Sequence, residues 1–115
     1  MALTLGMVTC DTTDALSLAR WWAEQTGGDI VEENDGWFVV VAVPGAPMLG
    51  FQRIDDPTAG KNRWHLDLSS QDVDAEVQRL LAAGASLVGE RTMPGMRWFT
   101  LADPDGNQFC VAPAH

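Results

Sequence analysis

The sequence has few basic residues, and this shortage argues against one class of partner. Lysine and arginine number 7 against 16 acidic residues, which gives a net charge of −9. A nucleic-acid-binding surface needs clustered positive charge to displace the counterions of the phosphate backbone, so we expect no nucleic-acid partner. The acidity is explained either by solubility alone or by a preference for cationic and neutral ligands.

Long apolar runs and cysteines are also scarce. No stretch approaches the roughly 18 apolar residues that a membrane-spanning helix needs, so we expect no membrane partner. The start of the chain, Met1–Leu5, lacks the charge and long apolar core of a signal peptide. Two cysteines, Cys10 and Cys110, do not make the disulfide framework of a small secreted protein. We therefore expect a cytoplasmic location, with a single Cys10–Cys110 bridge as the alternative.

The bulk composition is that of an ordinary globular protein. A length of 115 residues predicts one domain. With 46% hydrophobic and 20% charged residues, the chain can bury a core and remain soluble.

In the first half, alternating apolar residues predict strands and helical spacing predicts one helix. The helix has several candidate N-caps between Asp11 and Asp14, and it ends at Gly27–Gly28. Asn34-Asp35-Gly36 predicts a tight hairpin turn. The run 37–43 is hydrophobic on both faces, which is typical of a central strand. The predicted elements are strands over 3–10, 29–33, 37–43 and 48–54, with a helix from the cap to about Gln25 and its apolar side at Ala15, Leu18, Trp21 and Trp22.

The second half follows the same order of elements. Ser69 or Ser70 is the expected cap of its helix, and Gly84 its end. Asp103-Pro104-Asp105-Gly106 predicts a turn. The predicted elements are strands over 63–68, 86–90, 95–101 and 107–112, with an amphipathic helix that carries Val73, Val77, Leu80 and Leu81.

The two halves align at a constant offset in residue number. An offset of 58 takes Met7 to His65, Asp14 to Asp72 and Phe51 to Phe109. Such a repeat indicates two equivalent units, module one over 1–57 and module two over 58–115. Each has the order β-α-β-β-β.

Four stretches of the chain resemble the vicinal oxygen chelate superfamily, which includes glyoxalase I, extradiol dioxygenases, and the fosfomycin and bleomycin resistance proteins. They are 14–23, 49–53, Gly60-Lys61-Asn62-Arg63-Trp64-His65-Leu66-Asp67-Leu68, and Leu101-Ala102-Asp103-Pro104-Asp105-Gly106-Asn107-Gln108-Phe109. The chain is most similar to short bacterial glyoxalase-like proteins. The resemblance implies an α+β fold in which two β-α-β-β-β modules form a cup-shaped mixed sheet with helices outside. It also implies a homodimer.

In the metal enzymes of this superfamily, the first and last strands of each module supply one ligand each, typically His, Glu or Gln. The resemblance places these positions at Met7, Gln52, His65 and Cys110. Only His65 is a ligand of the usual type, and no carboxylate is present for Mg²⁺ or Mn²⁺. A softer ion such as Zn²⁺ would lack two strong ligands. We therefore expect no metal cofactor, with a divalent metal as the alternative.

Several residues have both a functional and a structural interpretation. His65 is either a hydrogen-bonded wall residue or a proton acceptor, since the unperturbed pKa of histidine is about 6.5. Cys110 is either an inert thiol or a nucleophile paired with His65. Lys61 and Arg63 are either solvated or anchors for a ligand carboxylate.

Aromatic and thioether side chains suggest the character of a ligand. Trp37, Trp64 and Trp98 lie on predicted strands, so one or two of them would line the cup. Met7, Met48, Met93 and Met96 would add adaptable apolar surface. Aromatic faces in an acidic surround favour flat or cationic organic ligands.

Two functions follow from these residues. The first is a metal-free small-molecule-binding protein, similar to bleomycin resistance proteins, with ligand contacts from Met7, Gln52, His65, Trp98 and Cys110. The alternative is a lyase or isomerase of glyoxalase type that uses His65 as its catalytic residue, with or without a divalent metal. A regulatory domain with a vestigial cavity is a third interpretation. The sequence leaves open whether the protein is an enzyme and what its ligand is.

Overall fold

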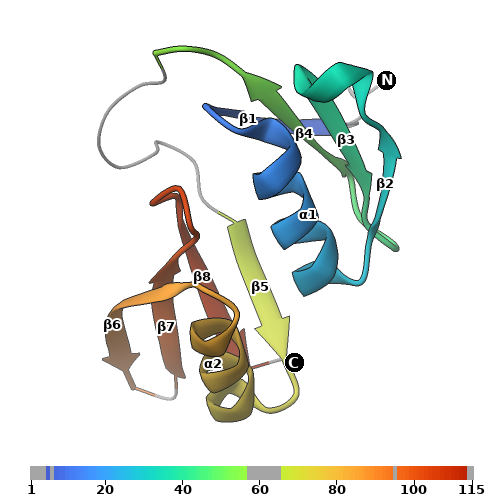
Figure 1. Cartoon of the computed structure of the whole chain (residues 1–115). Helices are drawn as coiled ribbons and strands as arrows, with labels where there is room; N and C mark the ends of the chain where they lie inside the picture. The colour runs from blue at the N-terminus through green and yellow to red at the C-terminus, as the bar shows by residue number, and fades with distance from the viewer. Residues whose placement is uncertain (1–4, 6, 57–65, 95, 114–115) are drawn as a thin grey trace. The chain divides into compact units, whose positions relative to one another are not determined.

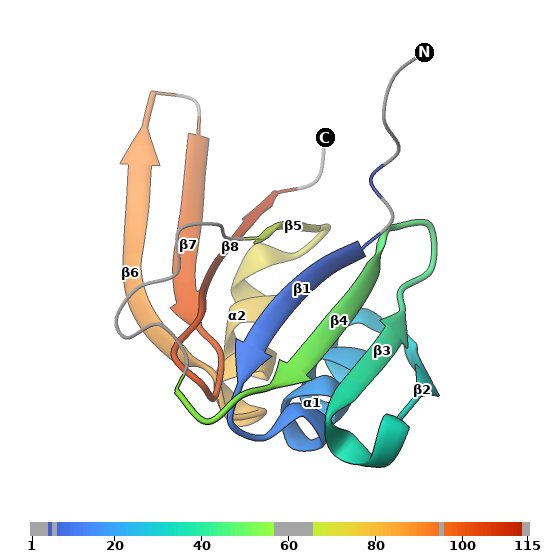
Figure 2. The same cartoon turned by 90° about the horizontal axis from the view of Figure 1, so that it is seen from above.

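The computed structural model describes residue 5 and the ranges 7–56, 66–94 and 96–113. The chain divides into two compact units, Met1–Thr58 and Ala59–His115. Each unit contains one four-stranded mixed sheet and one α-helix (Figures 1 and 2). Among the described residues, no helix is long and apolar enough to cross a membrane.

The first unit has its strands in the order β1-β4-β3-β2. The pair β1 and β4 is parallel, and the other two pairs are antiparallel. The elements are β1 Met7–Thr12, α1 Ala15–Thr26, β2 Asp29–Glu32, the short turn of helix η1 Asn34–Gly36, β3 Phe38–Ala42 and β4 Met48–Arg53. As predicted, β3 is internal, and its Val39, Val40 and Val41 are all buried.

The second unit repeats this topology with the order β5-β8-β7-β6. The pair β5 and β8 is parallel, and the other two are antiparallel. The elements are β5 Leu66–Ser70, α2 Val73–Ala82, β6 Ser86–Met93, β7 Met96–Ala102 and β8 Gln108–Pro113. The predicted α+β class with two β-α-β-β-β modules is confirmed.

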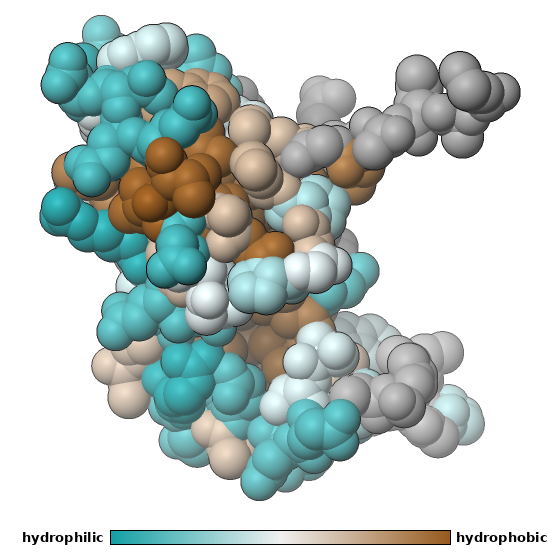
Figure 3. All heavy atoms as spheres, turned by 90° about the vertical axis from the view of Figure 1, so that its right-hand side faces the viewer, coloured by the Kyte–Doolittle hydropathy of each residue, from teal (hydrophilic) through white to brown (hydrophobic). Residues whose placement is uncertain are grey.

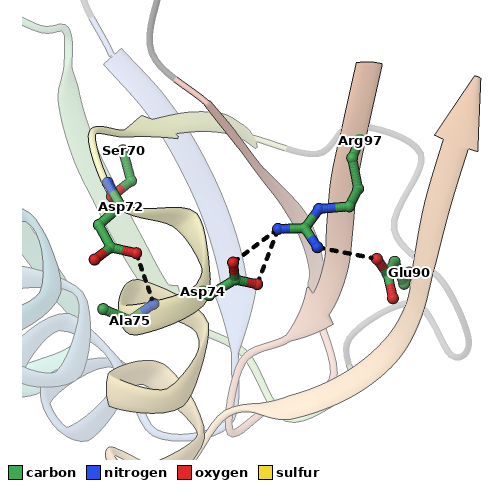
Figure 4. Close-up of polar contacts among 6 residues, drawn as sticks. All are labelled: Ser70, Asp72, Asp74, Ala75, Glu90 and Arg97. Carbon is green, nitrogen blue, oxygen red and sulfur yellow. Dashed lines mark hydrogen bonds and ion pairs between the residues drawn. The ribbon is translucent and has the colours of Figure 1, made fainter. Parts of the chain in front are cut away.

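Both helices begin with the same capping arrangement. The Asp14 carboxylate accepts a hydrogen bond from the Ser17 N–H at 3.1 Å. The Asp72 carboxylate accepts one from the Ala75 N–H at 3.1 Å, and Figure 4 shows this second contact. The prediction of Ser69 or Ser70 as the cap of α2 is wrong, because both belong to β5. Asp72 takes this position because a carboxylate is favoured at the positive end of the helix dipole.

At each cap, the last residue of the preceding strand accepts a hydrogen bond from the backbone N–H of the capping aspartate. Thr12 Oγ1 accepts a hydrogen bond from the Asp14 N–H at 3.2 Å, and Ser70 Oγ accepts one from the Asp72 N–H at 3.2 Å. These side chains hold the chain where it turns from strand to helix. The two strand-to-helix connections are thus equivalent, and Thr12 and Ser70 correspond at the predicted offset of 58.

The tight turn predicted between β2 and β3 is present and is left-handed. Asn34, Asp35 and Gly36 have φ values of 46°, 53° and 82°. Two successive backbone hydrogen bonds close the turn, from Gly36 N–H to the Glu33 carbonyl at 2.8 Å and from Trp37 N–H to the Asn34 carbonyl at 3.1 Å. Asn, Asp and Gly tolerate this region of backbone space better than other residues do, so the prediction rested on the right property.

Each helix buries its apolar side against one face of its own sheet (Figures 1 and 2). Trp22 is buried as predicted, and Trp21 is half-buried with its ring edge-on to Trp22 at 4.9 Å. The first core consists of Ala15, Leu18, Ala19, Trp22, Val39, Val41, Leu49 and Phe51, and the second of Val73, Val77, Leu80, Phe99, Leu101, Phe109 and Val111.

Some apolar side chains remain exposed at the edges of the sheets. The edge strands β2 and β6 each carry a bulge, at Val31 and at Val88, and these side chains are 51% and 43% exposed. Figure 3 shows hydrophobic surface surrounded by hydrophilic residues on the side of the molecule that carries β2. Bulges of this kind disrupt the hydrogen-bonding edge of a strand.

The strand registers correct the predicted constant offset. In the first unit Val39 pairs with Phe51, and in the second Phe99 pairs with Val111, so β3 and β4 match β7 and β8 at an offset of 60. The offset of 58 holds only for the first strand and the helix. The extra residues lie in the β6–β7 hairpin, because Glu32 and its partner Val40 are 8 residues apart, whereas Gly89 and its partner Thr100 are 11 apart. A longer hairpin connection leaves the packing of the following strands intact.

Candidate functional site

The face of each sheet opposite its own helix is the candidate site, and we call it the helix-free face. Successive side chains along a strand point to opposite faces, and paired residues on neighbouring strands share a face. On the first unit the pairs Met7–Met48, Thr9–Gly50 and Asp11–Gln52 lie on this face.

Three side chains of the first helix-free face converge on Gly50. A Cβ atom at Gly50 would lie 2.8 Å from Met7 Sδ, 3.0 Å from Thr9 Oγ1 and 3.1 Å from Phe38 Cζ. Only glycine leaves room for all three, so the side chains of Met7, Thr9 and Phe38 form a small cluster over the backbone of Gly50. Met7 and Met48 are 37% and 42% exposed, and their flexible thioethers form an adaptable apolar surface.

The structure does not bring Met7 and Gln52 together. Met7 pairs with Met48, and Gln52 is four residues further along the same strand, a distance of about 13 Å at the usual rise per residue. Both residues lie on the helix-free face, but the two side chains are at opposite ends of it. They are therefore poorly placed to share one metal ion.

The second helix-free face is more polar. Thr100 pairs with Cys110, and Cys110 pairs with Asp67, so these three side chains form a row across β7, β8 and β5. Thr100 Oγ1 and Cys110 Sγ are 3.6 Å apart, within hydrogen-bonding range of a sulfur atom. Trp98 is half-buried and is a diagonal neighbour of Cys110. The structure thus brings together two of the predicted ligand contacts, Trp98 and Cys110.

Other predicted site residues fall outside the description. His65, Trp64, Arg63 and Lys61 lie in the segment 57–65, which is outside the described residues. The roles of His65 as proton acceptor, wall residue or partner of Cys110 therefore stay predictions, as do those of Lys61 and Arg63.

The register changes which residue of the first unit matches Cys110. At an offset of 60 the counterpart of Cys110 is Gly50, and the counterpart of Gln52 is Ala112. The alignment of Gln52 with Cys110 from a constant offset is therefore wrong. A sequence signal for the true offset exists, because Pro44 and Pro104 correspond at this offset and lie in equivalent turns, closed by Ala46 and Gly106.

The residues at the family positions do not fit a metal ion that prefers oxygen ligands. Met7 supplies a thioether, and the last-strand positions of the two units are either Gly50 with the Cys110 thiol or the Gln52 amide with Ala112. Divalent ions such as Mg²⁺ and Mn²⁺ require carboxylates, which none of these positions has. Within the described ranges, no three His, Cys, Asp or Glu residues are grouped closely enough to hold a metal.

Two further residues of the second helix-free face were not identified from the sequence. Arg91 on β6 pairs with Trp98, and Gly89 pairs with Thr100. The bulge at Val88 determines that Gly89 and Arg91 face this way, and a bulge has no clear signal in a single sequence.

Comparison with solved structures supports the same architecture. The chain is similar to a glyoxalase/bleomycin resistance protein/dioxygenase family enzyme from Burkholderia phytofirmans PsJN, with a TM-score of 0.82 and 21% identity over 98% of this chain and 100% of that one. It is similar to TnmS3, an antibiotic binding protein from Streptomyces sp. CB03234, with a TM-score of 0.73 and 24% identity over 100% and 99%. It is also similar to lactoylglutathione lyase from Agrobacterium tumefaciens, with a TM-score of 0.73 and 16% identity over 99% and 96%. At these identities the likeness shows the fold alone.

A comparison with family models is more specific than the likeness to solved structures. None of the curated proteins matches the chain in sequence. A family model described as a glyoxalase-like domain matches residues 7–112, which is almost the whole chain. The chain therefore belongs to the family of glyoxalase-like domains.

Proposed function

We propose that this glyoxalase-like protein binds a small aromatic molecule without a metal ion and releases it unchanged. The observation that carries the proposal is the set of donors at the family positions. By the resemblance, the metal enzymes of the superfamily have strong ligands at the positions of Met7 and of either Gly50 with Cys110 or Gln52 with Ala112, none of which is a carboxylate or histidine here. His65 alone does not make a metal site.

The helix-free faces favour an aromatic ligand. Phe38 and Trp98 are counterparts at the offset of 60, and each is half-buried on its helix-free face. Aromatic rings offer large apolar area with specific stacking geometry. Met7 and Met48 add surface that adapts to different shapes.

A relative with the same fold gives this proposal a precedent. TnmS3 is named as an antibiotic binding protein. Because one fold hosts many functions, this precedent is an analogy, and the residues of the site carry the argument.

The alternative is a lyase or isomerase of glyoxalase type that uses His65, with or without a divalent metal. A neutral imidazole accepts protons near neutral pH, which suits general-base catalysis. The likeness to lactoylglutathione lyase favours this alternative at the level of fold.

Elemental analysis of protein purified without chelators separates the two functions. The proposed function predicts no stoichiometric metal. A stoichiometric ion that disappears in the His65→Ala variant would contradict it.

A thermal-shift screen with planar aromatic compounds tests the binding itself. A ligand at about 100 times its Kd stabilises the folded state by about 2.7 kcal/mol, so a rise in Tm of several degrees is expected. Trp98→Leu should weaken binding about three- to tenfold through lost stacking. Trp37→Leu is the matched control, because Trp37 is 54% exposed at the β2–β3 turn. Mass spectrometry of the compound after incubation should recover it unchanged, and turnover would support the enzyme instead.

We also propose a homodimer in the cytoplasm. Two-fold dimers are the commonest oligomers, and the edge strands still expose apolar side chains such as Val31 and Val88. The chain has only two cysteines, too few for the disulfide framework of a small secreted protein, which suits a reducing compartment. Light scattering should give twice the chain mass of 12.5 kDa, and a mass near 12.5 kDa would contradict the dimer.

A further inference from the structure

The second unit has three arginines among its described residues, and two of them are occupied by carboxylates. Arg79 pairs with Glu76, and its hydrogen bond lowers the pKa of that carboxyl. Arg97 donates to both oxygens of Asp74 at 2.9 Å, and its other terminal nitrogen lies 3.5 Å from Glu90 (Figure 4). Within 66–94 and 96–113, no ion pair or hydrogen bond joins Arg91 to another side chain.

Arg91 lies on the opposite face of the sheet from Arg97. Glu90, the residue before Arg91, points to the side of α2, where it meets Arg97. Alternation along β6 therefore places Arg91 on the helix-free face, beside its partner Trp98.

Because Gly89 has no side chain, the guanidinium of Arg91 can lie close to the sheet. A Cβ atom at Gly89 would lie 2.8 Å from Arg91 Nη1, 3.2 Å from Cζ and 3.5 Å from Nη2. The guanidinium therefore folds back over the backbone of Gly89, into space that only glycine leaves. This position places it next to the row that contains Thr100.

We propose that Arg91 anchors an acidic group of the ligand, while Trp98 stacks on the ligand's aromatic ring. The proposal rests on the proposed binding function and narrows its ligand to a planar aromatic anion, such as an aromatic carboxylate or sulfonate. A planar guanidinium offers a fork of N–H donors that matches the oxygens of such groups. Trp98 is the cross-strand neighbour of Arg91, so one molecule can contact both.

The net charge of −9 favours cationic and neutral ligands in general, but Asp67, an acidic residue of the same helix-free face, is distant from Arg91. Asp67 shares the helix-free face, but it lies three strands away from Gly89, about 14 Å at the usual strand spacing. Charges separated by more than about 8 Å are largely screened at physiological salt. Asp67 is therefore too far away to pair with Arg91.

Two fluorescent probes with the same aromatic skeleton test the proposal. Anilinonaphthalene sulfonate carries an acidic group, and phenylnaphthylamine lacks it. With the full chain, Arg91→Gln should weaken binding of the sulfonate about tenfold and leave binding of the uncharged probe unchanged. Arg91→Lys should restore part of the affinity, and added salt should weaken only the charged probe in the wild type.

Two further variants separate position from charge. Gly89→Ala keeps the positive charge but displaces the guanidinium, so it should weaken the sulfonate by a smaller factor than Arg91→Gln. Arg20→Gln removes an exposed arginine from α1 and should change neither probe. If Arg91→Gln leaves the ratio of the two affinities unchanged, the anchor is wrong, and binding of the uncharged probe would still support the proposed function. If the wild type binds neither probe, both the proposed function and the anchor are wrong.

Discussion

The two units of this protein share their framework and differ on their helix-free faces. Their caps at Asp14 and Asp72, their bulges at Val31 and Val88, and their strand orders are equivalent. On the helix-free faces, the first unit has Gly50 and Val40 where the second has Cys110 and Thr100. At these central positions the first face is thus apolar, and the second carries hydrogen-bonding groups.

This difference shows which positions the fold constrains. The helix side of each sheet must bury apolar surface, so both units keep large hydrophobic residues there. The individual core residues still differ in size: Leu49 corresponds to the larger Phe109, and Phe51 corresponds to the smaller Val111. The helix-free faces are not held by this packing, so their residues can be selected for a ligand.

The largest expected effect compares the two cores directly. Phe109 is 1% exposed, and Phe109→Ala should lower the free energy of unfolding by about 3–5 kcal/mol through the cavity it leaves. Its counterpart Leu49 is 9% exposed, and Leu49→Ala should cost less, about 2–3 kcal/mol. Urea unfolding measures both values. An equal or larger loss for Leu49→Ala would mean that the first core is the better packed.

An intermediate effect is expected at the two helix caps. Asp14→Ala and Asp72→Ala should each lower the free energy of unfolding by about 1 kcal/mol, because each leaves an N–H of the first turn without its acceptor. Asp14→Asn and Asp72→Asn are the controls, since asparagine also caps helices well. A difference of more than about 1 kcal/mol between the two alanine variants would break the equivalence of the units.

The smallest effect concerns a feature of the second unit that the first lacks. Arg97 joins α2 to β6 and β7 through Asp74 and Glu90, and its guanidinium carbon lies 5.2 Å from the Phe99 ring centre. Its counterpart in the first unit is Trp37, which has no charge. Arg97→Gln should lower the free energy of unfolding by about 0.5–1 kcal/mol, because exposed ion pairs contribute little.

Salt and a matched variant sharpen this last prediction. The loss on Arg97→Gln should shrink at high salt, which screens exposed charges. Arg91→Gln should change the free energy of unfolding by less than about 0.5 kcal/mol, since it removes no ion pair among the described residues. A larger loss for Arg91→Gln than for Arg97→Gln would assign Arg91 a structural role.

Much of the framework was predictable because its signals are local. Alternation placed the strands, and the apolar spacing of Leu18 and Trp22 placed the helix side that is buried. The serines before α2 misled the prediction of its cap, because Ser70 and Asp72 both accept backbone hydrogen bonds and only their places along the chain distinguish them.

The sequence by itself determined the two β-α-β-β-β modules and the family, since periodicity, capping residues and turn residues act within a few positions of one another. The tertiary structure decided the register of β4 and β8, which the sequence signals only through Pro44 and Pro104. This register makes Gly50, and not Gln52, the counterpart of Cys110. It also decided that Gly89 and Arg91 share a face with Trp98. Register and bulges depend on hydrogen bonds between strands far apart in the chain, and the side chain at one position cannot specify them.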